Sequence, residues 1–306
     1  MRVGLQSVAW IAVSLHPLVL GAGQLATVTV APEADTFVRS AAPTSNYGGA
    51  GAISISGSAA VNATNQQNGL FDSLIRFPMS NVVSTLDATL GTHDWLVLSA
   101  TLSLREMGAP PSPIFNRGVG AFEVRWIAAD AWVEGTGIPV VPTTNGVTWN
   151  DVPSLLNPAL DIALGQFTNA GVDGRLTFDL SPSQRFVSDV RSGGPVDLYL
   201  TAASPQVGFT ALSRGFSSSS NDVPILSVVA AVNPNPRLDS IVLAGTNVAV
   251  GFKTVSNWLY VLQRSDSLEG VWANVAMVPA QPTNASSVFV EAVTGQRTFY
   301  RLSVSH

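Results

Sequence analysis

The chain of 306 residues contains no cysteine, so it can form neither disulfides nor thiolate metal sites. Its three histidines are too few for a histidine-rich zinc site. Only 11% of the residues are charged, compared with about a quarter in an ordinary soluble protein. The net charge is −5 and no basic run occurs, so neither nucleic acid nor an anionic membrane is an expected partner.

The sequence also lacks an apolar run long enough to cross a membrane, which takes roughly 20 residues. The apolar stretch Val8–Leu20 follows Arg2 and precedes the small residues Gly21–Gly23. A positive start, a short apolar stretch and a small-residue exit are typical of a secretion signal. The alternative, a buried N-terminal helix, would place Pro17 in a helix interior. We expect residues 1–23 to be a cleaved signal peptide and the mature chain to be secreted, without a transmembrane segment.

Apolar and polar residues alternate at many places, whereas helical periodicity is nearly absent. Every second residue between 96 and 105 is apolar, which predicts a strand with one buried face. A single short helix is expected near residues 183–190. Many short strands joined by polar loops predict an all-β chain, organised as a β-sandwich or jelly roll. The same alternation occurs at Ile53 and Ile55, at Leu176, Phe178 and Leu180, and at Val196, Leu198 and Leu200.

A domain boundary is expected at residues 233–237, where Pro234 and Pro236 stiffen the chain and cannot join a central strand. Residues 24–232 would then form the first domain. The second, residues 238–306, has six candidate strands, which favours a small immunoglobulin-like or fibronectin-like β-sandwich. These strands are expected at Ser240–Leu243, Val248–Phe252, Leu259–Arg264, Trp272–Met277, Ser287–Glu291 and Thr298–Val304.

Short motifs follow one another in a fixed order from about residue 31 to residue 229. They are Ala34-Asp35-Thr36-Phe37, Ser45-Asn46-Tyr47-Gly48, Leu74-Ile75-Arg76-Phe77, Ala100-Thr101-Leu102-Ser103-Leu104, Trp132-Val133-Glu134-Gly135, Val147-Thr148-Trp149-Asn150-Asp151-Val152-Pro153, Phe178-Asp179-Leu180 and Phe216-Ser217 leading to Pro224-Ile225-Leu226. In this order they resemble the DNRLRE domain family, which overlaps the alginate-binding carbohydrate-binding module family 96. The resemblance implies a secreted, non-catalytic jelly roll. Ser218–Ser220 stand where that family commonly has an acidic residue, which weakens any ligand or ion contact there.

The C-terminal stretch looks like the small β modules that end many large secreted bacterial proteins. It contains Tyr260–Leu268, Trp272 and the closing segment Gln296–Leu302. The role of such modules is generally structural or unknown. The resemblance therefore implies a secreted location for the protein and implies no activity.

An active site is not apparent in the sequence. His93 lies in an expected loop, and neither of the other histidines, His16 and His306, is placed to serve as a catalytic base. A polysaccharide lyase would need a base such as Tyr47 or Tyr199, but no motif supports that role. A glycoside hydrolase would need two facing carboxyl groups, and no spacing selects a pair. The candidates are Glu106, Glu123, Glu134 and Asp151, of which Glu134 is better explained as a turn residue that bonds to the backbone.

Ligand binding is better supported, because side chains suited to sugars occur on strands and loops. Tyr47 lies in a glycine-rich loop, where its ring is expected to be exposed and to stack on a sugar. Arg39, Arg76 and Arg105 lie in expected strands and are candidates to bind uronate carboxylates, with ordinary solvated arginines as the alternative. The excess of arginine over the single lysine, Lys253, would fit an acidic target, but codon composition is the favoured explanation. Three tryptophans are instead expected in the core: Trp126, Trp132 and Trp149.

Asp35, Asp72 and Asp179 lie at expected strand ends and offer oxygen ligands to a structural calcium ion. Taken together, the sequence predicts a secreted, non-catalytic protein that binds polysaccharide, with acidic uronate glycans as the expected class. The alternative is a structural or adhesive surface protein that binds no glycan. A polysaccharide lyase or hydrolase is the least favoured function.

Overall fold

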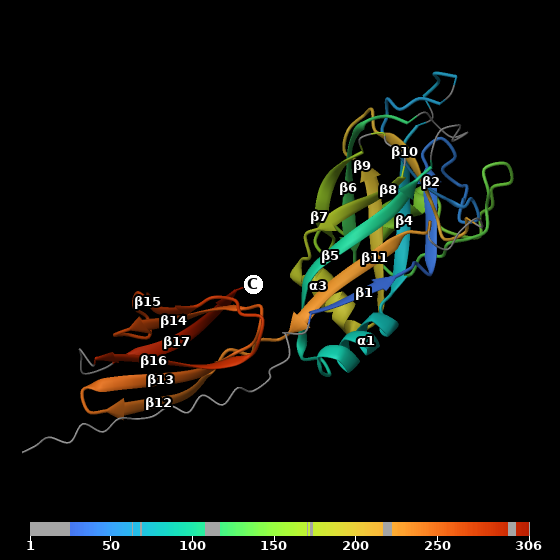
Figure 1. Ribbon diagram of the computed structural model, residues 1–306. Helices are drawn as coiled ribbons and strands as arrows, with labels where there is room; N and C mark the ends of the chain where they lie inside the picture. The colour runs from blue at the N-terminus through green and yellow to red at the C-terminus, as the bar shows by residue number, and fades with distance from the viewer. Residues whose placement is uncertain are drawn as a thin grey trace, which may run out of the picture. The chain divides into compact units, whose positions relative to one another are not determined.

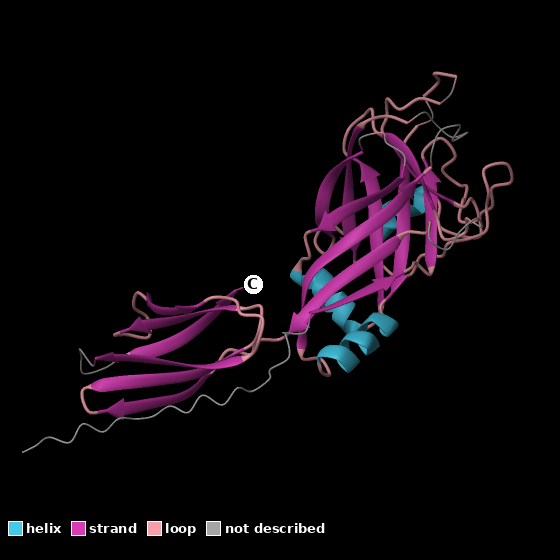
Figure 2. Cartoon of the chain, viewed as in Figure 1, coloured by secondary structure: helices cyan, strands magenta, loops and turns pink. Residues whose placement is uncertain are grey.

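The computed structural model describes residues 25–62, 64–67, 69–107, 117–169, 171, 174–216, 222–292 and 298–305. The expected signal peptide and the Ser217–Ser220 run lie outside these residues. The fold is all-β, as predicted (Figures 1 and 2). Residues 24–233 form one compact unit and residues 234–306 belong to a second, so the division falls inside the proline-containing segment. Among the described residues, none of the helices combines the length and apolar character needed to cross a bilayer.

All strand pairs of the first unit are antiparallel, and they form two layers that enclose the core. Layer A contains β1, β11, β5 and β8, and layer B contains β2, β4, β9, β6 and β7; β10 and β3 connect them. The connection is narrow, since β10 pairs with β5, and β3 with β4, through one residue pair each. The strands are β1 (Leu25–Val30), β2 (Ala34–Arg39), β3 (Ala52–Ser56), β4 (Phe71–Pro78), β5 (Trp95–Glu106), β6 (Gly120–Ile127), β7 (Ile162–Asn169), β8 (Gly174–Leu180), β9 (Pro195–Ala202), β10 (Gly208–Leu212) and β11 (Ile225–Val232).

The alternation that predicted the strands also predicts which side chains are buried. In β5 the side chains of Ala100, Leu102 and Leu104 point into the core, whereas Thr101 and Arg105 face outward. Layer B departs from this pattern, because β4 and β9 are buried along almost their whole length. Burial on both faces requires a third layer of chain over the outer face of layer B.

That third layer is the segment of residues 128–161 between β6 and β7, which we call the covering segment. It contains the short helices η1 (Trp149–Asp151) and α2 (Val152–Leu155). Its side chains form a second apolar cluster with the outer face of layer B. The sheet contributes Val38, Leu74, Ile127 and Tyr199 to this cluster, and the covering segment contributes Trp132, Val147 and Val152.

Two longer helices pack on the first unit, and only one of them was predicted. Helix α3 (Gln184–Ser192) lies where expected, and the Ser183 hydroxyl caps it by accepting the Phe186 N–H at 3.2 Å. Helix α1 (Ser80–Leu90) shows that the expectation of a single helix was wrong. It buries Val82, Leu86 and Leu90, which are spaced at four residues on one helix face. Its start carries no side-chain cap, so the sequence offers no clear beginning.

The second unit contains six strands at the expected positions. They form two three-stranded antiparallel sheets, β12-β13-β16 and β15-β14-β17. The sheets bury Val250 and Phe252 of β13 against Tyr260 and Leu262 of β14. Their bounds are β12 (Leu238–Ala244), β13 (Asn247–Thr254), β14 (Leu259–Ser265), β15 (Ala273–Val278), β16 (Ala285–Ala292) and β17 (Phe299–Ser305).

A buried amide joins the covering segment to the loop after β2. Asn46 is fully buried, and its Nδ2 donates to the carbonyl oxygens of Glu134 at 2.7 Å and Val147 at 2.9 Å. Its Oδ1 accepts the N–H groups of Gly48 at 3.1 Å and Gly137 at 3.2 Å. The four side-chain bonds of one asparagine are therefore all used, and each of them satisfies a backbone group.

We predict that Asn46→Ala destabilises the protein strongly, by roughly 3 kcal/mol or more. The truncation leaves buried backbone donors and acceptors unpaired, each at a cost of about 1–3 kcal/mol. The control is Asn145→Ala, because Asn145 belongs to the same segment but bonds to Thr136 and Thr143 at the exposed surface. Denaturant unfolding measures both variants, and equal losses for the two would contradict the role of Asn46.

Candidate functional site

Arg76 fastens the covering segment to layer B. Arg76 and Asp197 are direct cross-strand partners on β4 and β9, and Arg76 Nε donates to both Asp197 carboxylate oxygens at 3.0 and 3.2 Å. The guanidinium also donates through Nη1 to the Trp132 carbonyl oxygen at 3.3 Å and through Nη2 to that of Asp130. Arg76, which the sequence suggested as a ligand-binding residue, is therefore occupied by the protein itself.

Trp132 completes this link from the side of the covering segment. Its indole Nε1 donates to Asp197 Oδ1 at 2.6 Å, and the Arg76 guanidinium lies 4.7 Å from the centre of its ring. A buried indole needs an acceptor for its N–H, and Asp197 supplies it. Trp132 is buried as predicted, whereas Trp149 is only partly buried and lies in η1 instead of a strand.

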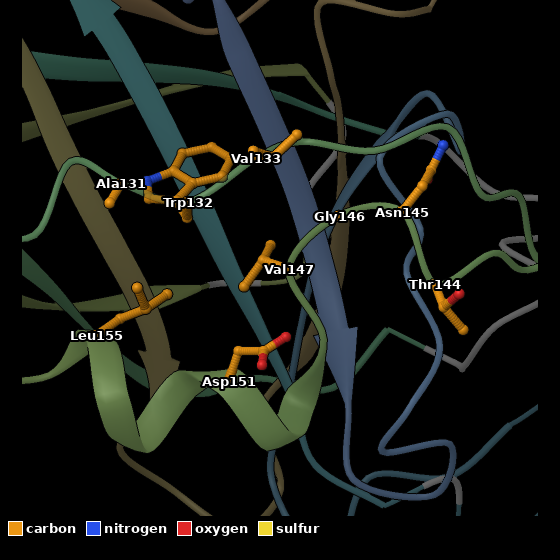
Figure 3. A pocket seen from close by; sticks show the side chains of 9 residues that line it. All are labelled: Ala131, Trp132, Val133, Thr144, Asn145, Gly146, Val147, Asp151 and Leu155. Atoms are coloured by element: carbon orange, nitrogen blue, oxygen red, sulfur yellow. The ribbon is translucent and has the colours of Figure 1, made fainter.

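The covering segment lines an open hollow of about 400 Å³ with both apolar and polar residues (Figure 3). Its wall is formed by Trp132, Val147 and Leu155, and Asp151 stands beside them. The Asp151 carboxylate accepts the Thr148 N–H at 2.9 Å, so it is used to shape the turn. The remaining lining residues are Ala131, Val133, Thr144, Asn145 and Gly146.

A second hollow, of about 350 Å³, lies where the covering segment leaves the outer face of layer B open. We call it the β6–β9 groove. Glu123 faces Thr201 and Arg125 faces Tyr199 as direct cross-strand partners, so these four side chains share one face of the sheet. The groove is lined by Glu123, Arg125, Tyr199 and Thr201 from the sheet and by Leu156, Pro158 and Asp161 from the covering segment and its junction with β7.

Glu123 and Arg125 form an ion pair at the surface of the groove. Arg125 donates to Glu123 Oε1 through Nε at 2.9 Å and through Nη2 at 2.6 Å. Within the described part of the chain, Glu123 Oε2 has no donor and Arg125 Nη1 has no acceptor. A free acceptor and a free donor therefore stand side by side on a rigid strand.

The other polar groups of the groove are tied to the protein. Asp161 accepts the N–H of Ala128 at 3.1 Å and that of Asn157 at 2.6 Å, which closes the base of the covering segment. The Tyr199 hydroxyl donates to Asp72, and burial raises the pKa of both groups. Of the two carboxylates in the groove, one is thus paired with arginine and the other bonded to backbone, an arrangement without a free acid and base.

The four ligand-binding residues expected from the sequence do not form one site. Tyr47 is only 3% exposed and stacks on Phe37 with ring centres 4.7 Å apart, so the expectation of an exposed ring was wrong. Arg39 lies over the Phe71 ring at 5.3 Å. Arg105 belongs to layer A, where its Nε lies 3.8 Å from Asp222.

The three aspartates expected to bind calcium are also separated. Asp35 is fully buried in β2. Asp72 lies on the opposite face of the sheet, because its cross-strand partner Val38 is three residues from Asp35 and side chains alternate along a strand. Asp179 lies exposed on β8 of layer A. Within the residues that the structure describes, no three histidine, aspartate or glutamate side chains come together to hold a metal ion.

The structure agrees with the expectations for Glu134 and His93, but the sequence did not predict the groove residues Glu123 and Arg125 as a binding site. Glu134 accepts the Asp35 backbone N–H at 3.1 Å, in agreement with a backbone-bonding role, and also pairs with Arg214. His93 is exposed in a loop. The sequence suggests Glu123 only as a catalytic candidate and does not single out Arg125. The strict alternation of Phe122-Glu123-Val124-Arg125-Trp126 was the available signal, since it places both charges on one face.

Comparisons with known proteins do not assign the chain to a family. No protein-family model matches it, and no curated protein matches it. Among solved structures, that of the Macrobrachium rosenbergii nodavirus is 12% identical, covers 99% of this chain and 95% of its own, and has a TM-score of 0.23. The structure of allantoicase is 8% identical, covers 76% of this chain and 73% of its own, and has a TM-score of 0.18.

Two buried carboxyls predict a dependence of stability on pH. Burial raises the pKa of Asp197 to about 6 against the opposing effect of Arg76, and burial raises that of Asp35 to about 6 as well. A carboxyl whose pKa is higher in the folded state binds its proton more tightly when folded. Its contribution to stability therefore falls as pH rises from the unfolded value near 3.8 through the folded value near 6.

We predict that Asp35→Asn reduces the loss of stability between pH 4 and pH 7. Asparagine retains an acceptor for the Arg214 N–H, which Asp35 binds at 2.8 Å, and removes the buried charge. The control is Asp179→Asn, because this carboxyl is exposed. Melting temperatures over this pH range test the prediction, and a profile for Asp35→Asn parallel to that of the parent would refute it.

Proposed function

We propose that the chain is an exported, non-catalytic polysaccharide-binding protein and that the β6–β9 groove is its binding site. The observation that carries the proposal is the open sheet face beside the covering segment, with unpaired hydrogen-bonding atoms on Glu123 and Arg125. Both lie on a strand, and binding groups on strands are held more rigidly than groups on loops. A jelly-roll arrangement of the first unit and export through residues 1–23 are part of the same proposal.

The chemistry of the groove suits a sugar ring. Sugars offer hydroxyl groups that both donate and accept hydrogen bonds, and C–H faces that pack on apolar surface. Glu123 Oε2 accepts from one hydroxyl while Arg125 Nη1 donates to another. Leu156 and Pro158 form an apolar wall for the C–H groups. A few fixed polar groups within an otherwise apolar concavity are the usual composition of a small-molecule site.

The absence of a catalytic role in this proposal follows from how the carboxylates are used. Hydrolysis of a glycosidic bond needs a protonated acid and a second carboxylate that acts as base or nucleophile. Glu123 is ion-paired with Arg125, and Asp161 accepts two backbone N–H groups. Both carboxylates are therefore occupied by partners within the protein, which favours binding over proton transfer.

We predict that residues 24–306 are retarded in affinity electrophoresis through gels that contain a polysaccharide ligand. The panel contains xylan, hydroxyethylcellulose, alginate, pectin and a gel without polymer. Removal of the groove ion pair by Glu123→Ala with Arg125→Ala is expected to weaken binding at least about 10-fold, equal to about 1.4 kcal/mol. Failure of every polymer to retard the parent chain would overturn the proposal.

The second unit offers a matched control for this experiment. Arg264 and Glu291 form an ion pair at 2.8 Å with a similar degree of exposure to that of Arg125 and Glu123. The double variant Arg264→Ala with Glu291→Ala removes the same two side chains at a distance from the groove in sequence and in a separate unit. It is expected to bind like the parent.

The alternative function, a structural or adhesive role, is favoured by β12. This strand pairs only with β13 among the described strands, and Ile241, Val242 and Leu243 are 56%, 54% and 69% exposed. An unprotected apolar edge is a template for another strand. The occupant proposed is β12 of a second copy, paired antiparallel about Ile241, which places Ser240 opposite Val242 on the same sheet face in both copies.

The alternative function predicts that the chain forms dimers through β12. Val242→Lys is expected to give a monomer, because a charged side chain on an edge strand opposes pairing. The control is Val271→Lys, which changes a valine that is 92% exposed and lies outside the strands. Light scattering at several protein concentrations measures the mass. A monomeric parent chain, without added polymer, would exclude this function.

A further inference from the structure

We infer that the β6–β9 groove selects neutral, hydroxyl-bearing glycans and discriminates against polyuronates. This inference rests on the proposed function and narrows its ligand class. It reverses the expectation drawn from the sequence, in which arginines on strands were candidates to bind uronate carboxylates. The reason is the placement and pairing of the charges that line the groove.

The groove contains more negative than positive charge. Glu123 and Asp161 contribute two carboxylates, and Arg125 contributes the one guanidinium among the described lining residues. Both N–H groups on one edge of that guanidinium are bonded to Glu123. An incoming carboxylate would therefore meet a neutralised arginine with two like charges nearby, and like charges at close range in a partly buried site repel.

Displacement of Glu123 from Arg125 by a ligand carboxylate would give no gain in binding free energy. The ligand would break two charge-assisted bonds of 2.9 and 2.6 Å to make two equivalent bonds. It would also leave the Glu123 carboxylate without its partner in a half-buried position. Loss of the partner is unfavourable for a partly buried charge, because the remaining charge is uncompensated.

The arginines expected to recognise uronates lie elsewhere. Arg76 is held between Asp197 and the covering segment, with a side chain that is 14% exposed. Arg39 is partly buried over Phe71, and Arg105 is on layer A. None of the three lines the groove. The cationic surface that a polyuronate requires is therefore missing from this site.

A neutral sugar, in contrast, uses the groove as it stands. One hydroxyl donates to Glu123 Oε2 and a neighbouring hydroxyl accepts from Arg125 Nη1, while the ion pair between these residues stays intact. A sugar site built on such a preformed pair loses affinity sharply when either partner is changed, because an unpaired group remains.

The test compares pairs of polymers that share a backbone and differ at one group of each sugar, a carboxylate in one polymer and a primary alcohol in the other. Alginate and polygalacturonate are each used beside the neutral polymer obtained by reducing their carboxyl groups to primary alcohols, together with xylan and hydroxyethylcellulose. We expect the parent chain to bind at least one neutral polymer, with a dissociation constant at least about 10-fold lower than for any polyuronate. Binding of the neutral polymer is expected to change little between about 0.05 and 0.5 M NaCl, because no net charge is involved.

The decisive variant is Glu123→Gln, which keeps the shape of the side chain and releases Arg125 from its ion pair. We expect it to weaken neutral binding several-fold and to strengthen polyuronate binding at low salt, so that the selectivity narrows or inverts. The matched control is Glu291→Gln, which removes the corresponding carboxylate from the Arg264 pair of the second unit. It is expected to change neither the binding of neutral polymers nor that of polyuronates.

The possible failures are distinguishable. A parent chain that prefers a polyuronate, and loses that preference with Arg125→Ala, would overturn the inference and leave the proposed function intact. Neutral binding that does not respond to Glu123→Gln or Arg125→Ala would show that the groove is not the site, and would overturn both. A parent chain that binds no polymer of the panel would likewise overturn both.

Discussion

The ion pair between Arg76 and Asp197 is the interaction on which the rest of the first unit depends. It joins the central strands β4 and β9, and through Trp132 and Asp130 it attaches 34 residues of chain, 128–161, to the outer face of the sheet. Without that attachment the apolar side chains of the sheet face, Leu74 among them, would be exposed to water. The attachment also decides which part of the face stays open. Arg76 and Asn46 hold the covering segment on one part of the outer face. Asp161 ties the end of the segment to its start by accepting the Ala128 N–H, and the β6–β9 groove remains open beside it.

A buried ion pair of this kind is expensive in solvation, so its worth lies in specificity more than in stability. Each polar atom in it is matched by a partner from another part of the chain. The Arg76 guanidinium has acceptors in three residues, and the two Asp197 oxygens receive donors from Arg76 and Trp132. An incorrectly docked covering segment would leave these atoms unpaired in an apolar layer. The arrangement therefore favours one position of the segment over its alternatives.

The strands were predictable from the sequence, because burial of one sheet face imposes a period of two that is visible in residues 96–105. The helix Ser80–Leu90 was missed because eight of its 11 residues are weak helix formers (Val, Thr, Ser, Asn and Asp) and no side-chain cap marks its start. The site was less predictable. Arg76 is surrounded by apolar residues in the sequence, which indicated a solvent face, but its partners lie 54 to 121 residues away. Tyr47 failed for a related reason, since the glycines around it serve close packing: a Cβ at Gly48 would lie 2.1 Å from the Glu134 carbonyl oxygen. Which strands pair, and what covers them, is information that local pattern does not contain.

The contacts that hold the covering segment span long stretches of chain, 88 and 101 residues for Asn46 and 121 for the Arg76–Asp197 pair. Contacts so distant in sequence form only after the intervening chain has collapsed, since closure of each loop costs entropy before the contact repays it. Arg76 and Asp197 are cross-strand partners on β4 and β9, so this anchor of the covering segment exists only while those two strands are paired. Local opening of a native protein begins in segments whose local stability is lowest, such as a loop segment docked on the outside of a sheet. The covering segment, which forms one wall of the groove, can therefore open locally while the protein stays folded. We therefore expect the amide hydrogens of residues 128–161 to exchange with solvent faster than those of β4 and β9 beneath them.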